Sequence, residues 1–230
     1  MKVALSIADW FALSTECDDR NAWRQKFSLP TREEGEVVIL PAMMRRRMSG
    51  LTKLTLRCSL SLAQRAEHID YAVFASRHGE LQRTGGLLQS LADDDLLSPM
   101  GFAQSVHNTA AGLHTIISQQ KLPISSMAAG KQSFAQAWLE AFIYLRQHPH
   151  ATVLLQYFDE PVPEKLSAFC RQPGEALALG LLVKASPAME SPSLPYRNDE
   201  DLPEVIRQLL LTGEAGVFSV EVCPGNENAC

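Results

Sequence analysis

Short runs of apolar residues alternate along this 230-residue chain with longer stretches in which apolar positions recur at helical spacing. Short continuous apolar runs are typical of strands buried on both faces. They predict strands over 37–40, 71–75, 124–129, 152–158, 176–183 and 217–222. Helical spacing predicts helices over 49–66, 98–118, 134–145 and 202–211. Because strands and helices alternate, the pattern predicts an α/β fold with a largely buried sheet.

Two of these helices have typical first residues. Ser49 fits the N-cap of the first, and Ser98 with Pro99 opens the second, since proline is favoured in a first helical turn. The apolar face of the second helix runs through Phe102, Val106, Ala110, Leu113 and Ile117.

The stretch 186–201 is the one clear loop, because Pro187, Pro192 and Pro195 interrupt any regular element there. It lies between a predicted strand and a predicted helix, so it is either a surface excursion or a hinge to a small C-terminal appendage. We favour the excursion. We therefore expect a single domain over 1–230, with 186–230 forming a loop and a short C-terminal extension.

Composition narrows the classes of function. Apolar residues make up 46% and charged residues 20%, as in ordinary globular proteins. The net charge of −5 lacks the basic field of a nucleic-acid binder. Apolar runs such as 176–183 are far shorter than the roughly 20 residues of a membrane helix. Asp9 interrupts the N-terminal apolar run, and the five cysteines are scattered. We therefore expect a reduced, cytoplasmic protein without a secretory signal or membrane span.

The segment 98–112 is the most distinctive in the chain. Small residues crowd it, which allows another backbone to approach closely, and His107 and Asn108 are predicted in the middle of its helix. Buried polar side chains need hydrogen-bond partners. On these residues alone, the ordinary interpretation is a packed helix with a satisfied histidine.

Four segments together resemble a known family. They are 41–49 (PAMMRRRMS), 75–81 (ASRHGEL), 98–112 with its Ser98-Pro99 and Ser105-Val-His-Asn108 elements, and 123–134 (PISSMAAGKQSF). Their order is similar to that in β-ketoacyl synthases of the thiolase-like fold, and especially to the shortened relatives called chain-length factors. The short form associated with aryl polyene biosynthesis is the nearest likeness. The resemblance implies a layered α/β fold matching the N-terminal half of a synthase, with a truncated second half.

The resemblance also implies a missing nucleophile. An active condensing enzyme carries a cysteine at the turn between a strand and a helix, where the helix N-terminus lowers the thiol pKa. In this chain that position falls on Lys131, within one or two residues, and no neighbour is a cysteine. His148 and His150 do not match the catalytic histidines of the family. We therefore expect a non-catalytic subunit that needs no cofactor and binds no metal.

The family implies a partner for such a subunit. Condensing enzymes of this fold are dimers, so we expect a heterodimer with an active ketosynthase, in which this chain helps to shape the acyl tunnel. Met100 and Phe102 are candidates for the tunnel wall, and His107 and Asn108 for polar contacts at the interface. Plain core or subunit packing explains Met100 and Phe102 equally well.

Arg45, Arg46 and Arg47 form the only dense basic patch. One interpretation is the solvated start of a helix, as most charge runs are. The other is docking of an acidic acyl carrier protein or its phosphopantetheine phosphate, since guanidinium groups bind phosphate through paired hydrogen bonds.

Two alternative functions stay open. The first is an independent acyltransferase or hydrolase that uses Lys131 or Ser133 at the modified turn, although no base or oxyanion partner is recognisable. The second is a free-standing homodimer that binds acyl carriers. The pattern S-x-x-K at 118–121 lacks the companion motifs of serine acyl enzymes.

Overall fold

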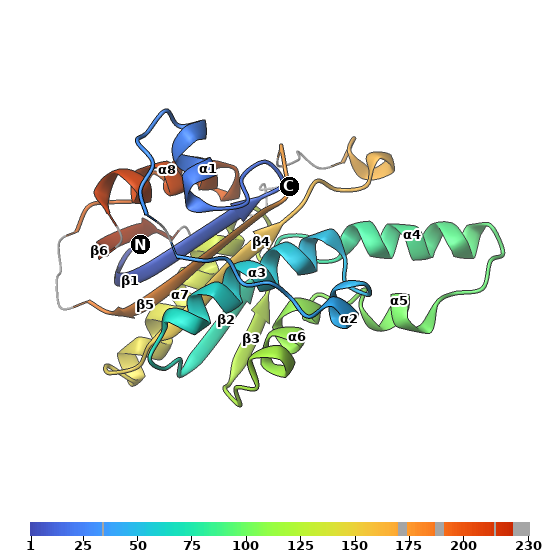
Figure 1. Ribbon diagram of the computed structural model, residues 1–230, viewed down its shortest axis with the longest axis horizontal. Helices are drawn as coiled ribbons and strands as arrows, with labels where there is room; N and C mark the ends of the chain where they lie inside the picture. The colour runs from blue at the N-terminus through green and yellow to red at the C-terminus, as the bar shows by residue number, and fades with distance from the viewer. Residues whose placement is uncertain (34, 170–173, 187–190, 214, 223–230) are drawn as a thin grey trace.

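Six strands form one mixed sheet in the computed structural model, which describes residues 1–33, 35–169, 174–186, 191–213 and 215–222 (Figure 1). The strands are β1 (Lys2–Ser14), β2 (Tyr71–Ala75), β3 (Ile124–Met127), β4 (Val153–Asp159), β5 (Leu177–Ala185) and β6 (Gly216–Glu221). Their order across the sheet is β3-β2-β4-β5-β1-β6. The strands β3, β2 and β4 are parallel, whereas β5 runs antiparallel to β4 and β1, and β6 runs antiparallel to β1.

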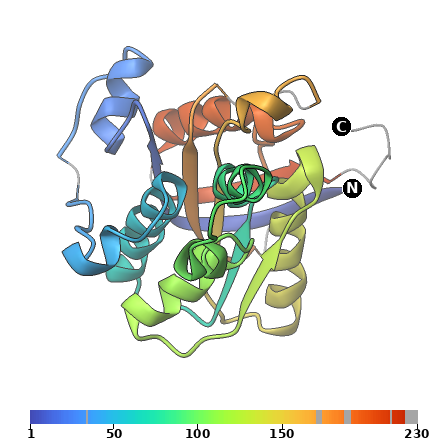
Figure 2. The ribbon, with the colours of Figure 1, turned by 90° about the vertical axis from the view of Figure 1, so that its right-hand side faces the viewer.

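Helices cover both faces of this sheet (Figures 1 and 2). The α-helices in the described residues are α1 (Arg20–Lys26), α2 (Ala42–Arg45), α3 (Gly50–Arg65), α4 (Leu81–Ala92), α5 (Pro99–Ala103), α6 (Thr109–Ser118), α7 (Ser133–Gln147) and α8 (Leu202–Thr212). Short 3₁₀ turns are η1 (Gly130–Gln132), η2 (Glu164–Leu166) and η3 (Asp199–Asp201). No described helix has the length and apolar character needed to span a bilayer.

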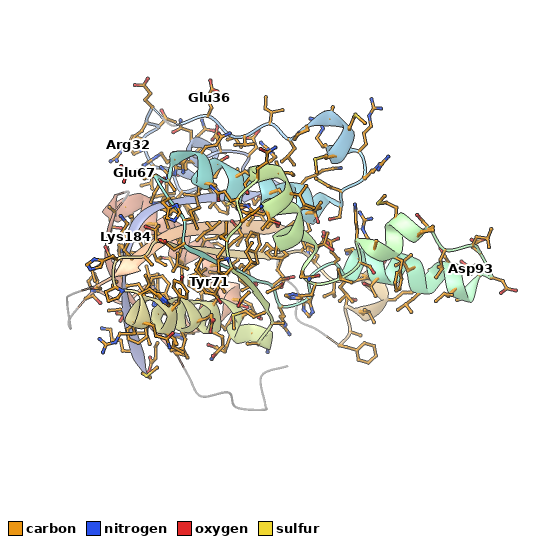
Figure 3. All side chains as sticks on the ribbon, turned by 90° about the horizontal axis from the view of Figure 1, so that it is seen from below. Arg32, Glu36, Glu67, Tyr71, Asp93 and Lys184 are labelled. Atoms are coloured by element: carbon orange, nitrogen blue, oxygen red, sulfur yellow. The ribbon has the colours of Figure 1, made fainter. Side chains whose placement is uncertain are left out.

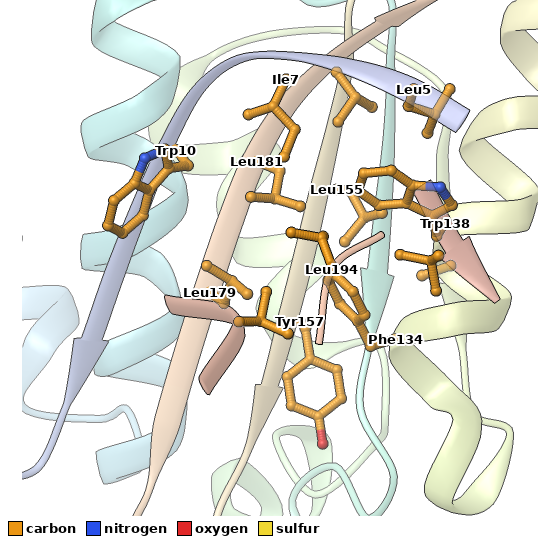
Figure 4. Packing of buried hydrophobic residues seen from close by; sticks show 14 of the residues in the cluster. Leu5, Ile7, Trp10, Phe134, Trp138, Leu155, Tyr157, Leu179, Leu181 and Leu194 are labelled. Atoms are coloured by element: carbon orange, nitrogen blue, oxygen red, sulfur yellow. The ribbon is translucent and has the colours of Figure 1, made fainter. Parts of the chain in front are cut away.

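The two faces of β4 show how the strands build two cores. Val153, Leu155 and Tyr157 point to one face, where they pack with residues of α7 and α8 (Figure 4). Leu154 and Phe158 point to the other face, against α3 and α6. This alternation follows from the two-residue period of a strand. Each fully buried side chain of this size contributes about 1.5–3 kcal/mol of burial free energy.

Most elements predicted from the sequence are present. The predicted strands at 71–75, 124–129, 152–158, 176–183 and 217–222 match β2, β3, β4, β5 and β6 within a few residues. The predicted helices at 49–66, 134–145 and 202–211 match α3, α7 and α8. Ser49 is the N-cap of α3, since its hydroxyl accepts the Thr52 backbone N–H.

The predicted strand at 37–40 is wrong. That segment has no regular secondary structure and pairs with no described strand; its Val38 N–H donates instead to the hydroxyl of Ser61 on α3 at 2.9 Å. Leu40 is buried in a small satellite core with Met48, Leu56 and Leu60. Ile39 is 84% exposed, so this apolar run marks neither a strand nor a continuously buried segment.

The single helix predicted over 98–118 is also wrong. It is split into α5 and α6, and residues 104–108 between them are not helical. The hydroxyls of Ser105 and Thr109 donate to the carbonyls of Phe102 and Val106. Such local side-chain bonds compete with continuous helix formation. Phe102 and Val106 are consequently 64% and 46% exposed instead of lying on a buried face with Ala110.

Of the described strands and α-helices, β1, α1, α2 and α4 were not predicted. The register of β1 against β5 shifts between Ile7 and Asp9. The Asp9 carboxylate accepts hydrogen bonds from Arg20 at 2.7 Å and Arg65 at 2.8 Å, so a charge interrupts the apolar pattern without ending the strand. Helix α4 buries no residue and pairs with α5 in an arm that extends beyond the sheet, with Asp93 at its tip (Figures 1 and 3).

The C-terminal segment joins the same sheet. Within the described part of 186–201, Leu194 and Tyr196 are buried in the core under α7 and α8. The following α8 packs on that core, and β6 pairs with β1. Pro187 lies outside the described residues.

Candidate functional site

The turn between β3 and α7 is the place where the sequence predicts a missing nucleophile. β3 ends at Met127, Gly130 takes a φ of 55°, and η1 leads directly into α7. Only glycine adopts that left-handed conformation at low cost. Lys131 lies in this turn and is half-buried. The described cysteines, Cys17 and Cys58, are buried elsewhere, on the segment after β1 and on α3.

The neighbouring Ser133 is fully engaged. Its hydroxyl accepts the Ala129 N–H at 3.0 Å and donates to the Gly130 carbonyl at 2.7 Å. The side chain is fully buried. A nucleophile needs an exposed oxygen and a base within hydrogen-bond reach. Ser133 therefore closes the turn rather than offering a reactive group.

A carboxylate that sequence reasoning missed occupies the start of α7. Asp199 accepts the backbone N–H of Phe134 at 3.0 Å and that of Ser133 at 3.2 Å. The Tyr196 hydroxyl donates to the same carboxylate at 2.6 Å. A helix N-terminus attracts negative charge, and here the chain itself supplies the anion. Burial raises the pKa of Asp199 to about 6.

Two further acids lie at the carboxyl ends of the parallel strands. The Asp159 carboxylate accepts backbone N–H groups from Arg77 at 3.1 Å and Glu160 at 3.2 Å, and the Ser76 hydroxyl at 3.4 Å. Burial raises the pKa of Asp159 to about 7. Burial, together with the nearby charges of Glu80 and Asp159, raises the pKa of Glu160 to about 7. These groups titrate near neutrality but, within the described residues, form no group of three or more suited to a metal ion.

His107 links three elements of the site. Its Nε2 lies 2.9 Å from the Ser76 carbonyl and must donate to it, so its Nδ1, 3.0 Å from the Ser126 Oγ, accepts that hydroxyl. The segment between α5 and α6 is thereby fastened to the ends of β2 and β3. Gly79, with a φ of 56°, packs so closely that a Cβ atom there would lie 2.9 Å from the His107 ring.

His107 therefore does not lie in the middle of a helix, as the sequence predicted, and neither does Asn108, which is the exposed N-cap position of α6. Both residues line a surface hollow of about 520 Å³ beside the edge strand β3. The other residues that line it include Ala111 and Gly112. The prediction that His107 needs a hydrogen-bond partner agrees with its two observed bonds.

Met100 and Phe102 lie on α5, whose N-cap is Ser98, and both are exposed, at 43% and 64%. They are two residues apart on a helix, so their side chains leave it on opposite sides. Met100 lines a hollow together with Met43 and Met44. The structure thus separates the two residues that the sequence grouped.

Arg45, Arg46 and Arg47 are exposed on and just after the four-residue helix α2. The backbone carbonyl of Arg47 accepts the Arg83 guanidinium at 3.3 Å, which fastens the end of this segment to α4. The three guanidinium groups are therefore presented to solvent from an anchored backbone.

Comparison with known proteins gives this geometry a context. The sequence pattern of the β-ketoacyl synthase N-terminal domain matches residues 20–207. A comparison with curated proteins found no match. One solved structure is a ketosynthase (ApeO) in complex with its chain length factor (ApeC) from Xenorhabdus doucetiae. The present chain is 33% identical in sequence to the matching chain of that complex, with a TM-score of 0.70 over 80% of each chain.

Two more distant structures share the fold. The ishigamide ketosynthase/chain length factor is 20% identical with a TM-score of 0.61, over 83% of this chain and 64% of that one. The AntDE:AntF complex, a type II polyketide synthase acyl-carrier protein with its ketosynthase, is 14% identical with a TM-score of 0.61, over 80% and 63%. These matches confirm the α/β fold class predicted from the sequence. Because the family's sequence pattern covers most of this chain, the chain belongs to the β-ketoacyl synthase N-terminal domain family.

Proposed function

We propose that this chain is a non-catalytic chain-length factor that pairs with an active ketosynthase and helps to shape its acyl tunnel in aryl polyene biosynthesis. The observation that carries the proposal is the likeness, at 33% identity over 80% of both chains, to a complex of a ketosynthase with its chain length factor. The partner would supply the catalytic cysteine and histidines.

The turn before α7 supports the non-catalytic part of the proposal. Lys131 stands at the expected position of the nucleophile, and the Asp199 carboxylate accepts the first amides of α7. A second anion at that helix start, such as a thiolate or a tetrahedral oxyanion, would meet like charge there. Ser133, the alternative nucleophile, is buried and hydrogen-bonded on both sides.

The surface of the chain supports particular roles in this assembly. Met100 and Phe102, both exposed on α5, are our candidates for the wall of the acyl tunnel at the partner interface. His107 and Asn108, beside the edge strand β3, are our candidates for polar interface contacts. Arg45, Arg46 and Arg47 are our candidates for docking an acidic acyl carrier protein.

Co-expression with a candidate ketosynthase partner tests the proposal. We expect both chains to elute together in size exclusion, and the complex to form ketoacyl products from acyl- and malonyl-carrier proteins. The chain alone should form none, and Lys131→Ala in the complex should leave the rate unchanged. Turnover by the isolated chain that disappears in Lys131→Ala would instead establish an independent enzyme. A chain that never elutes with the synthase would contradict the pairing.

A further inference from the structure

A hollow of about 380 Å³ lies beside the last turns of α7, between this helix and the strands β1 and β5. We call it the α7 hollow; its apolar lining residues are Leu5, Phe142, Leu145, Pro149 and Ala185. An α-helix rises about 1.5 Å per residue, so the lining residues at the end of α7 lie about 20 Å from the turn at Lys131. The α7 hollow is therefore distinct from the site described above.

The walls of the α7 hollow are held in place by the fold. Leu5 of β1 and Leu145 of α7 are 0% and 1% exposed, so they belong to the core at its base. At the end of α7, the His148 ring stacks on Tyr144 with 4.3 Å between centroids, and Tyr144 stacks on Tyr71 of β2 at the same distance. This stack fixes the end of the helix against the sheet. A ligand that enters a site with fixed walls pays little for ordering them.

Among the described residues that line the α7 hollow, Arg146 is the only charged one, and the other polar residue, Ser186, is neutral. Arg146 is exposed, and no carboxylate of the described part of the chain pairs with its guanidinium. A cation in the last turn of a helix is favourable in any case, because carbonyl groups gather there. What distinguishes Arg146 is its place at the edge of an apolar hollow with no acid beside it. Its guanidinium is therefore open to an anion from outside the chain.

The size and chemistry of the α7 hollow define the class of ligand. Apolar walls with a single polar anchor are the usual form of a small-molecule site, and about 380 Å³ lies at the lower end of the 300–1,000 Å³ typical of such sites. A guanidinium binds a carboxylate through two parallel hydrogen bonds. One guanidinium balances one negative charge, which favours a monovalent carboxylate over a doubly charged phosphate.

We propose that the α7 hollow binds a short-chain fatty acid, whose carboxylate pairs with Arg146 and whose alkyl chain packs against Leu5, Phe142 and Leu145. A thioester-linked acyl group has no carboxylate and gains nothing from Arg146, so the site selects the free acid. This inference goes beyond the proposed function, because the hollow lies within this chain and needs no partner.

Isothermal titration of the full chain with octanoate, and with 1-octanol as the uncharged analogue, tests the proposal. We expect octanoate to bind at one site with a Kd below about 1 mM. Arg146→Gln should weaken octanoate binding by about tenfold and leave 1-octanol binding unchanged, because only the acid meets the charge. Lys184→Gln is the matched control: it removes a positive charge next to Ala185, but Lys184 lines a different hollow, since successive strand residues point to opposite faces. It should leave octanoate binding unchanged.

Ala185→Leu, which adds volume inside the hollow, should weaken the binding of both ligands. Arg146 and Lys184 are exposed, so their substitution should leave the fold intact. A wild-type chain that does not bind octanoate would overturn the proposal, and so would equal octanoate affinity of Arg146→Gln and the wild type, or an equal loss in Lys184→Gln. If the chain is obtained only together with a ketosynthase, the same variants are compared in the complex, where any site in the synthase contributes equally to each. No condensation is measured, so failure here leaves the proposed pairing intact.

Discussion

The carboxylate of Asp199 accepts the backbone N–H of Phe134 at 3.0 Å, across a separation of 65 residues. This bond joins the C-terminal segment to the helix whose N-terminus follows the turn at Lys131. The same carboxylate binds the Ser133 N–H and the Tyr196 hydroxyl. Asp199 and Tyr196, within and after the proline-rich loop, therefore hold the start of α7, beside the turn where we propose that the nucleophile of an active relative would lie.

Asp199→Ala should destabilise the protein by about 1–3 kcal/mol, because α7 loses its cap and the buried Tyr196 hydroxyl loses its acceptor. Urea unfolding followed by circular dichroism measures the change. Asp95→Ala, at an exposed position in the α4–α5 arm, is the control and should change stability by less than about 0.5 kcal/mol. Equal stability of both variants would show that the cap contributes nothing.

The buried acids predict a specific dependence of stability on pH. Burial raises the pKa values of Asp159 and Glu160 to about 7, and that of Asp199 to about 6, from ordinary values of 3.8 to 4.5. The folded state therefore binds more protons than the unfolded chain. The contribution of these three carboxyls to the free energy of unfolding is full below about pH 4 and is lost as the pH rises through 6 to 7. Burial lowers the pKa of His114 to about 4 and also lowers the pKa of His78, so these two histidines oppose the trend below about pH 6.5. The lowered pKa of Glu175 opposes it only in acid.

We expect the free energy of unfolding to be lower at pH 8 than at pH 5 by at least about 1 kcal/mol. Asp159→Asn should flatten this slope, because the amide does not titrate. Glu204→Gln should not flatten it, since Glu204 is paired with Arg207 on the surface and its pKa is lowered. Urea midpoints across this pH range decide the matter. A stability that rises from pH 6.5 to pH 8, where His114 and His78 no longer contribute, would show that the pKa values of these carboxyls are not raised.

Gly79→Ala should destabilise the protein by about 1–3 kcal/mol. Residue 79 has a φ of 56°, and an added Cβ would lie 2.9 Å from the His107 ring. Gly86→Ala is the matched control on α4, with no atom within 4 Å of its Cβ, and should stabilise by about 0.5–1 kcal/mol. Combining Gly79→Ala with His107→Ala should remove the steric part of the cost but not the backbone part. Additive effects of the two changes would show that the contact with His107 carries no energy.

The sequence contained most of the sheet but little of the site. β2 and β4 are short, continuous apolar runs, so local pattern alone identified them. β1 escaped because Asp9 interrupts its pattern, and the residues that neutralise this charge include Arg65, which is 56 positions away. α4 escaped because it contains Gly85 and Gly86, which are unfavourable inside a helix, and because none of its residues is buried.

The site depends on contacts that no spacing rule contains. The turn at Lys131 was predicted from the family resemblance of the segment around it, which is a local signal: a short strand, a glycine and a helix in succession. Asp199 could not be found that way: it lies in an ordinary acidic run, and only the fold brings it to α7. His107 was predicted inside a helix, but local hydroxyl bonds and its contact with Ser76 override helical propensity there.

Phe102 gives the proposed tunnel role its sharpest test. The side chain is 64% exposed on α5, so in a heterodimer its volume would fall on the partner rather than in this chain's own core. A growing acyl chain stops where further carbons would overlap packed atoms, and such overpacking costs about 1–3 kcal/mol. That cost changes a rate by roughly tenfold, at 1.36 kcal/mol per factor of ten. Phe102→Ala should therefore lengthen the products of the complex, and Phe102→Trp should shorten them.

Mass spectrometry of carrier-bound products measures the distribution of product lengths. Val106→Ala is the control for a general loss of apolar surface, because Val106 is also exposed. If both Phe102 variants assemble with the synthase and yield the wild-type lengths, Phe102 only packs at the interface, and the limit on chain length lies within the synthase.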